Sequence, residues 1–182
     1  NKVVISYIGT HGLAHGLKFI LESISKITNP DLHFLFIGDG AEKKNLIEFS
    51  KKLRSKNFTF LESVTKNEIP LYIELSDFSL VNLKKSEEFK NVIPSKIFEN
   101  IAMYKPILLG VDGESKKLIQ NYKVGVCFKP EDKKSFLTSI ENIINFRDES
   151  FKKNCDKMIA DFDRNKIAQN MIKFIYSHIE DV

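Results

Sequence analysis

The stretch SYIGTHGLAHGLKF, residues 6–19, joins a β-rich run to a helical run through three glycines. The β-rich run extends from Val3 to Ile8, and apolar residues recur at helical spacing between Leu17 and Ile27. The glycines at this connection are Gly9, Gly12 and Gly16. A buried strand that leads directly into an amphipathic helix is typical of an α/β fold.

The alternation of strands and helices continues along the chain. Further strand-like runs occupy residues 32–40, 58–63, 78–83, 106–110 and 124–128, and helical patterns separate them. Alternation at this short spacing, without an internal repeat, predicts a parallel sheet with helices on both faces. We therefore expect an α/β domain with a six-stranded parallel sheet. Its ligand site is expected at the carboxyl ends of the strands, near the switch in strand order.

The end of the chain reads as helix only, from about Phe151 onward. Its apolar residues form one broad face: Ile167, Met171, Ile172, Phe174, Ile175 and Ile179. We therefore divide the chain into an α/β domain, residues 1–150, and C-terminal helices, residues 151–182. Because the sequence begins without Met and directly in a strand, we expect it to be a piece of a longer polypeptide.

Composition narrows the class of function. The 182 residues are 42% hydrophobic, which is enough to bury a core. The net charge of +4 comes mostly from lysines that are mixed with acids along the chain, so a nucleic-acid partner is disfavoured. Cys127 and Cys155 are too few and too far apart for a disulfide framework or a metal cluster, and a reducing cytoplasm fits them. The sequence shows no membrane-spanning run or signal peptide.

The glycine loop departs from both common phosphate-binding fingerprints. Its spacing is G-x-x-G-x-x-x-G, whereas a dinucleotide site requires G-x-G-x-x-G and an acid about 20 residues later. The acid here is Asp39, 30 residues after Gly9, and no G-x-x-x-x-G-K-[ST] motif is present. A glycine loop before a helix can still present backbone N–H groups to an anion. An ordinary tight turn explains the three glycines equally well.

His11 and His15 lie in this loop, at the predicted ligand edge. Each is expected either to contact a polar ligand or to be a structural histidine. The sequence offers no third His or Cys at metal-binding spacing, so a metal site is disfavoured.

The stretch NVIPSKIFENIAMYKPILLG, residues 91–110, contains a second candidate. Pro94 and Ser95 open a predicted helix, with Ser95 as its N-cap. The expected buried face is Ile97, Phe98, Ile101 and Ala102. Glu99 lies one turn after Ser95, where a carboxylate can accept hydrogen bonds from two adjacent ribose hydroxyls. Lys96 and the N–H groups at the helix start can meet a phosphate. An ordinary amphipathic helix with an exposed Glu–Lys pair remains the alternative.

Four stretches in this order, YIGTHGLAHGL, FIGDG, VIPSKIFENIAMYKPILLGVDGE and VGVCFKPED, resemble the C-terminal half of glycosyltransferase family 4. More narrowly, they resemble bacterial fucosaminyltransferase-like surface-polysaccharide transferases. The resemblance covers residues 3–145.

The resemblance implies half of a GT-B fold, a Rossmann-like three-layer αβα domain that binds a nucleotide-sugar donor. It implies a retaining, metal-independent glycosyltransferase of the hexosyltransferase type, with a UDP-linked sugar as co-substrate and no other cofactor. The acceptor would be a lipopolysaccharide or surface polysaccharide, bound by a missing N-terminal domain toward which residues 151–182 would pack. The enzyme would be cytoplasmic, at the inner face of the bacterial membrane through that domain, and this chain alone would be inactive.

The resemblance also implies site residues. The second Glu of the family's E-x7-E signature matches Glu99, on the ribose, and the first matches Asn91, near the donor sugar, so the charge is lost there. A basic pair for the diphosphate falls near Thr10 and His15, a second departure. The catalytic positions are thus Asn91 and Glu99. The donor-binding positions are Gly9, Thr10, His11, Gly12, His15, Val64, Val92, Ile93, Pro94, Ser95, Lys96 and Glu99. A non-catalytic nucleotide-binding module and a dinucleotide-dependent oxidoreductase are the alternatives.

Overall fold

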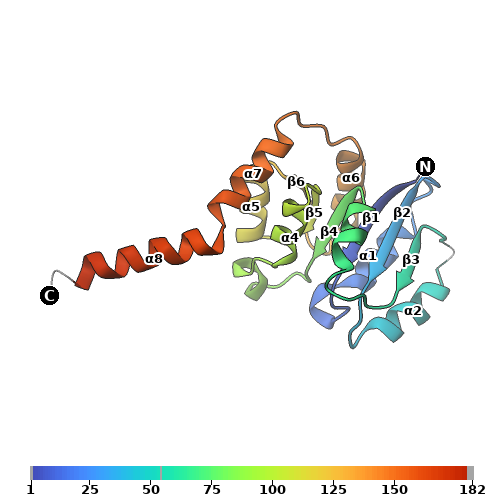
Figure 1. Cartoon of the computed structure of the whole chain (residues 1–182). Helices are drawn as coiled ribbons and strands as arrows, with labels where there is room; N and C mark the ends of the chain where they lie inside the picture. The colour runs from blue at the N-terminus through green and yellow to red at the C-terminus, as the bar shows by residue number, and fades with distance from the viewer. Residues whose placement is uncertain (1, 54, 180–182) are drawn as a thin grey trace.

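The computed structural model describes residues 2–53 and 55–179, and its elements follow the predicted alternation (Figure 1). The strands are β1 (Val3–Ile8), β2 (Leu32–Ile37), β3 (Phe58–Leu61), β4 (Phe78–Asn82), β5 (Ile107–Gly110) and β6 (Gly125–Cys127). They pair in parallel in the order β3-β2-β1-β4-β5-β6. The predicted six-stranded parallel sheet is confirmed, and strand order reverses between β1 and β4.

Helices connect these strands. They are α1 (Leu17–Ile24), α2 (Lys43–Lys51), α3 (Ile69–Glu74), α4 (Lys96–Ala102), α5 (Glu114–Tyr122), α6 (Lys133–Ile144), α7 (Phe151–Asp161) and α8 (Arg164–Ile179), with short 3-10 helices η1 (Leu13–His15) and η2 (Glu88–Asn91). The prediction that the first helix runs to Ile27 is wrong. The amides of Lys26 and Ile27 bond to carbonyls three residues back, which tightens the chain into a turn after Ile24.

The sheet is buried on both faces, which gives the three-layer architecture. Leu80 of β4 and Leu108 of β5 belong to a core that they share with α1, α2 and α6. Their neighbours Val81 and Leu109 belong to a second core, shared with α4, α5 and α7. Strands buried in this way read as continuous apolar runs, which explains why the sequence predicts them well.

Helix α4 differs in part from the prediction. Ile97 and Ile101 are fully buried, but Ala102 is exposed and Asn100 is buried in its place. The Nδ2 group of Asn100 donates to the Lys96 carbonyl at 2.7 Å. The predicted role of Ala102 is wrong because the helix ends there, and Tyr104 takes a left-handed φ of 53° that turns the chain into β5.

The C-terminal stretch forms two helices. Helix α7 packs against α4 and α5 and buries Cys155 and Met158. Helix α8 follows after Phe162 and Asp163 and extends away from the rest of the molecule, drawn in red in Figure 1. The side chains of residues 164–178 are exposed. The side chain of Ile179 and residues 180–182, which belong to the predicted helical stretch, lie outside the described residues.

Candidate functional site

Two loops meet where the strand order reverses, and this is the edge at which parallel sheets bind ligands. One follows β1 and the other follows β4. Asn82, the last residue of β4, donates from Nδ2 to the His15 carbonyl at 2.7 Å. The amide of Lys84 donates to the Ala14 carbonyl at 2.8 Å. The glycine loop is therefore held against the loop that leads toward α4.

The glycine loop is also bonded to the loop after β2. The amide of Gly9 donates to Ile37, and the amide of His11 donates to Asp39, at 2.9 and 2.8 Å. A Cβ atom on Gly38 would collide with the Gly9 carbonyl, and one on Gly40 would lie 2.6 Å from the His11 carbonyl. Gly38 and Gly40 are thus required by close packing of two loops.

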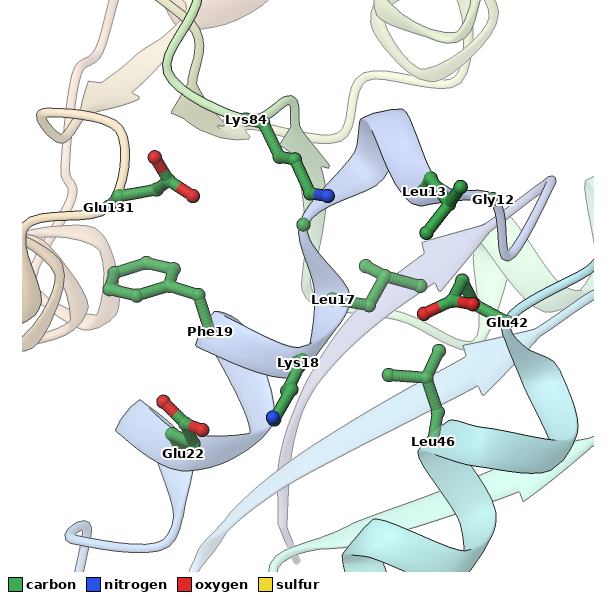
Figure 2. A pocket seen from close by; sticks show the side chains of 11 residues that line it. Gly12, Leu13, Leu17, Lys18, Phe19, Glu22, Glu42, Leu46, Lys84 and Glu131 are labelled. Carbon is green, nitrogen blue, oxygen red and sulfur yellow. The ribbon is translucent and has the colours of Figure 1, made fainter.

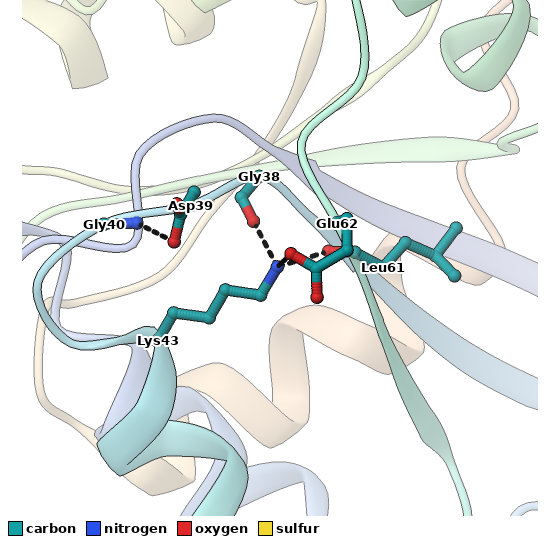
Figure 3. Close-up of polar contacts among 6 residues, drawn as sticks. All are labelled: Gly38, Asp39, Gly40, Lys43, Leu61 and Glu62. Carbon is teal, nitrogen blue, oxygen red and sulfur yellow. Dashed lines mark hydrogen bonds and ion pairs between the residues drawn. The ribbon is translucent and has the colours of Figure 1, made fainter.

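The side chain of Lys43 holds this junction together (Figure 3). Its buried Nζ atom donates to the Gly38 carbonyl at 2.8 Å, to the Leu61 carbonyl at 3.0 Å and to the Glu62 carboxylate at 2.7 Å. One side chain of α2 therefore links the carboxyl ends of β2 and β3.

The end of β1 and the glycine loop, together with α3 and the start of α4, line a pocket of about 240 Å³. Its lining is Ile8, Gly9, Thr10, His15, Ile69, Ile73, Ser95, Lys96, Glu99 and Asn100. A second pocket shares Ile8, Gly9, Thr10 and Ile69 with the first and contains Val64. Seven predicted positions thus line this pair of pockets, hereafter the switch-point pocket: Gly9, Thr10, His15, Val64, Ser95, Lys96 and Glu99.

Lys96 supplies the positive charge of the switch-point pocket. Its Nζ atom lies 4.1 Å from the centre of the Tyr7 ring. A Cβ atom on Gly9 would lie 2.8 Å from the same nitrogen, so the ammonium sits directly on the loop. Among the described residues it has no hydrogen-bond or ion-pair partner. Burial lowers the pKa of Lys96 to about 8, and the charge of Glu99 partly offsets this.

Backbone donors complete the positive side of the pocket. Within residues 2–53 and 55–179, the amides of Thr10 and Lys96 have no hydrogen-bond partner. The amides of Ile97, Phe98 and Glu99 are already bonded to the carbonyls of Pro94 and Ser95. The Ser95 side chain caps nothing, so the prediction of a side-chain N-cap is wrong. Helix α4 therefore offers fewer free N–H donors than expected. More of the positive charge in the pocket comes from the Lys96 side chain.

The two histidines have different environments. His15 is half-buried and lines the pocket, and burial, followed by the charge of Lys96, lowers its pKa below 6.5. His11 is 0% exposed, between Tyr7 and Phe60, with ring centroids at 5.7 and 5.9 Å. His11 was predicted as a donor-binding position, but its ring is enclosed at the junction of the two loops and does not line the switch-point pocket.

The other predicted positions do not line the switch-point pocket. Gly12 has an extended φ of −105° and lines a different pocket, with Lys18, Lys84 and Glu131 (Figure 2). Asn91 is the last residue of η2 and is exposed. Val92 and Ile93 are also exposed, and the Val92 carbonyl accepts from Ser115 Oγ at 2.6 Å. The Pro94 carbonyl accepts from the Ile97 amide.

Three residues of the site were missed by sequence reasoning. Tyr7 and Asn82 are strand residues near the carboxyl ends of β1 and β4, and Lys43 lies on α2. A polar side chain that ends an apolar strand was the available signal for Asn82. Nothing in the sequence distinguishes Lys43 from the neighbouring lysine at position 44.

In the part of the chain that the structure describes, no helix is long and apolar enough to cross a membrane. Across residues 2–53 and 55–179, no three or more His, Cys, Asp and Glu side chains are grouped so that they could hold a metal ion.

Comparisons by sequence and by structure both find glycosyltransferases. The family described as "Glycosyl transferases group 1" matches residues 1–166. The chain is 25% identical over 173 residues to a Bacillus subtilis relative, TuaH, named for teichuronic acid biosynthesis; the match covers 94% of this chain. A glycosyltransferase from Rickettsia africae superimposes on all of this chain with a TM-score of 0.78 at 18% identity. Anabaena HepE in complex with UDP superimposes on 97% of it with a TM-score of 0.78 at 18% identity.

The chain spans about half the length of these proteins: 43% of TuaH and 49% of both solved structures. The expected GT-B type domain is confirmed by these structural neighbours, and the family match covers most of the chain. This chain belongs to the family of group 1 glycosyl transferases.

Proposed function

We propose that this chain is the donor-binding half of a glycosyltransferase and that its switch-point pocket holds the nucleoside diphosphate of a sugar donor. The observation that carries the proposal is the convergence of an unpaired ammonium, Lys96, with the free Thr10 amide and the Glu99 carboxylate in one pocket. A cation and an N–H group suit a diphosphate, and a carboxylate suits a pair of ribose hydroxyls.

Each side of the pocket has one role in this proposal. Glu99 is exposed at the rim and accepts hydrogen bonds from the ribose hydroxyls. Lys96 and the Thr10 amide face the diphosphate between them. Val64, in the adjoining part of the pocket, packs against the base. Asn91 lies outside the pocket, so its proposed contact is with the donor sugar, which projects from the diphosphate.

The geometry suits the chemistry of glycosyl transfer. When the bond from the anomeric carbon to the diphosphate oxygen breaks, negative charge develops on the leaving diphosphate. A fixed cation and a fixed N–H group stabilise that charge without reorganisation. On the resemblance to glycosyltransferase family 4, the proposal includes a retaining, metal-independent transfer from a UDP-sugar. The acceptor, a lipopolysaccharide or surface polysaccharide, binds to a further domain of the same polypeptide at the inner membrane face.

The comparisons support the class of ligand. The fold matches Anabaena HepE, which has been crystallised with UDP and with UDP-glucose. The relative TuaH is named for the biosynthesis of a polysaccharide, teichuronic acid. That this chain matches about half of each protein is consistent with a partner domain.

Calorimetric titration of this chain with UDP, GDP and uridine tests the proposal. UDP is expected to bind more tightly than uridine, and Glu99→Gln should weaken UDP binding about tenfold, because it removes charge-assisted hydrogen bonds. Glu48→Gln is the control, since Glu48 is an exposed residue of α2 outside the pocket. With 2′-deoxy-UDP the effect of Glu99→Gln should shrink. Equal affinities for UDP and uridine would contradict the proposal.

A dinucleotide-dependent oxidoreductase, the alternative raised by the sequence, would need the glycine loop at the end of β1 to bind a dinucleotide. It predicts that NADH fluorescence rises when the chain is added. Under the first proposal the NADH signal stays unchanged, and EDTA leaves the affinity for UDP unchanged.

A further inference from the structure

Tyr7 contacts both sides of the switch-point pocket from within the sheet. It lies in β1, is 1% exposed, and places its ring beneath the Lys96 ammonium at 4.1 Å. Its hydroxyl donates to the Thr10 carbonyl at 2.6 Å. A single buried side chain thus touches the cation of α4 and the loop whose amide is free.

The Lys96 ammonium needs such a contact, because the described residues offer it no carboxylate or carbonyl at hydrogen-bonding distance. A lysine side chain has several rotatable bonds and loses considerable entropy when it is held in place. An aromatic face attracts a cation most strongly when water is excluded, and it leaves the N–H donors of the ammonium free. A carboxylate would also hold the lysine, but it would compete with an anionic ligand.

The hydroxyl of Tyr7 fixes the other side. This hydroxyl stays protonated and neutral, because burial raises the pKa of Tyr7 above its ordinary value. As a donor, it holds the Thr10 carbonyl inward, and the carbonyl of Gly9 is held by packing against Gly38. The Thr10 amide shares its peptide unit with the Gly9 carbonyl, and Tyr7 holds the next peptide unit, so Thr10 is fixed on both sides relative to Lys96.

We propose that Tyr7 is a positioning residue of the donor site: its ring holds the Lys96 ammonium and its hydroxyl holds the Thr10 loop, so that both converge on one diphosphate. The inference rests on the function proposed above. It gives a physical reason why this chain can have Thr10 and His15 where basic side chains are expected: the cation comes from α4 and is placed by β1. The ionisable groups around that ammonium are Glu99 on its own helix, His15 and His11 on the loop, and Tyr7 itself.

The test compares UDP and uridine binding to the wild-type chain, Tyr7→Leu, Tyr7→Phe and Lys96→Met. Tyr7→Leu removes the ring and should weaken UDP about tenfold while uridine binding stays the same. Tyr7→Phe keeps the ring and should weaken UDP only about twofold to threefold. In the Lys96→Met background, Tyr7→Leu should have little further effect, because the cation that the ring places is gone. Tyr122→Leu is the control: it removes a ring near Lys157, away from the pocket.

A measurement without nucleotide keeps the inference testable if Tyr7→Leu fails to fold. In the wild-type chain with labelled lysine, NMR should show one side chain, absent in Lys96→Met, whose ε-protons are shifted upfield by a ring. Its pKa should be near 8 rather than 10.5. In Tyr7→Phe the upfield shift should remain.

The possible failures are distinguishable. If the wild-type chain binds UDP no better than uridine, the proposed function is wrong and the inference falls with it. If UDP binds to the wild type and folded Tyr7→Leu binds it within twofold, the inference alone is wrong. An unshifted Lys96 spectrum in the wild type also overturns the inference alone.

Discussion

The Nζ atom of Lys43 lies 2.7 Å from the Glu62 carboxylate, but the two side chains have very different surroundings: that of Lys43 is 6% exposed and that of Glu62 is 86% exposed (Figure 3). An ion pair whose acid is in water contributes little. Lys43 therefore stabilises the structure mainly by donating to the carbonyls of Gly38 and Leu61. These two hydrogen bonds hold the junction of the loops next to the switch-point pocket.

Lys43→Met should therefore lower the free energy of unfolding by about 2 kcal/mol or more, because two carbonyls at the sheet edge lose their donor. Glu62→Gln should change it by less than about 0.5 kcal/mol. Urea denaturation of both variants measures the difference. If Glu62→Gln costs as much as Lys43→Met, the ion pair and not the carbonyl contacts holds the junction.

Close packing of the two loops gives a second prediction. Gly38→Ala should destabilise the chain by about 3 kcal/mol, because the new Cβ would collide with the Gly9 carbonyl and the residue has a φ of 139°. Gly12→Ala is the matched control: its φ is −105°, and its Cβ would make ordinary contact, at 3.5 Å, with Thr10. Thermal unfolding should show a lower Tm for Gly38→Ala only. A similar loss in both would mean that contact with the Gly9 carbonyl is not what makes Gly38 necessary.

The fold was predictable because burial on both faces leaves a simple pattern. Leu80 and Val81 face different cores, so β4 reads as an unbroken apolar run, and the short helical intervals between such runs require parallel strands. The edge that carries the site follows from this topology. Glu99 and Lys96 were predicted at the site because they share the first turn of a helix that begins at that edge.

The contacts within the site were not predictable in the same way. His11 and His15 are both polar residues of one loop, and the burial of the His11 ring between Tyr7 and Phe60, residues distant in sequence, shows which of them is enclosed. Tyr7 and Lys96 are far apart in sequence, so no periodicity links them. Ala102 was assigned to the core by helical spacing, which assumes a helix longer than the one that forms.

The enclosed imidazole of His11 predicts acid sensitivity. Burial lowers the pKa of His11 to about 4, with a smaller effect from Lys43, whereas an exposed imidazole keeps a pKa of 6.5. Between these pH values the unfolded chain binds a proton that the folded chain does not. The stability that His11 contributes is therefore fully present above pH 6.5 and is lost as the pH falls to about 4, by up to a few kcal/mol.

His11→Phe should reduce this loss, because an aromatic ring between Tyr7 and Phe60 cannot take up a proton. Scanning calorimetry from pH 4 to pH 7 measures Tm for the wild type and the variant. His178→Gln, a change at an exposed position of α8, is the control and should follow the wild-type curve. An unchanged slope in His11→Phe would assign the acid sensitivity to other groups, such as His15 and His33, whose pKa values burial also lowers.

The contrast between α7 and α8 gives the last prediction. Phe162, just after α7, packs against Phe98 with ring centroids 5.1 Å apart, and Met158 is fully buried, whereas Phe174 on α8 is 64% exposed. Truncation after Phe162 should therefore leave Tm within about 2 °C of the full chain, since it removes no described buried side chain. Met158→Ala, which leaves a cavity in the core beneath α7, should cost about 2–5 kcal/mol. A fall in Tm on truncation as large as that of Met158→Ala would show that α8 folds back onto the α/β domain in solution.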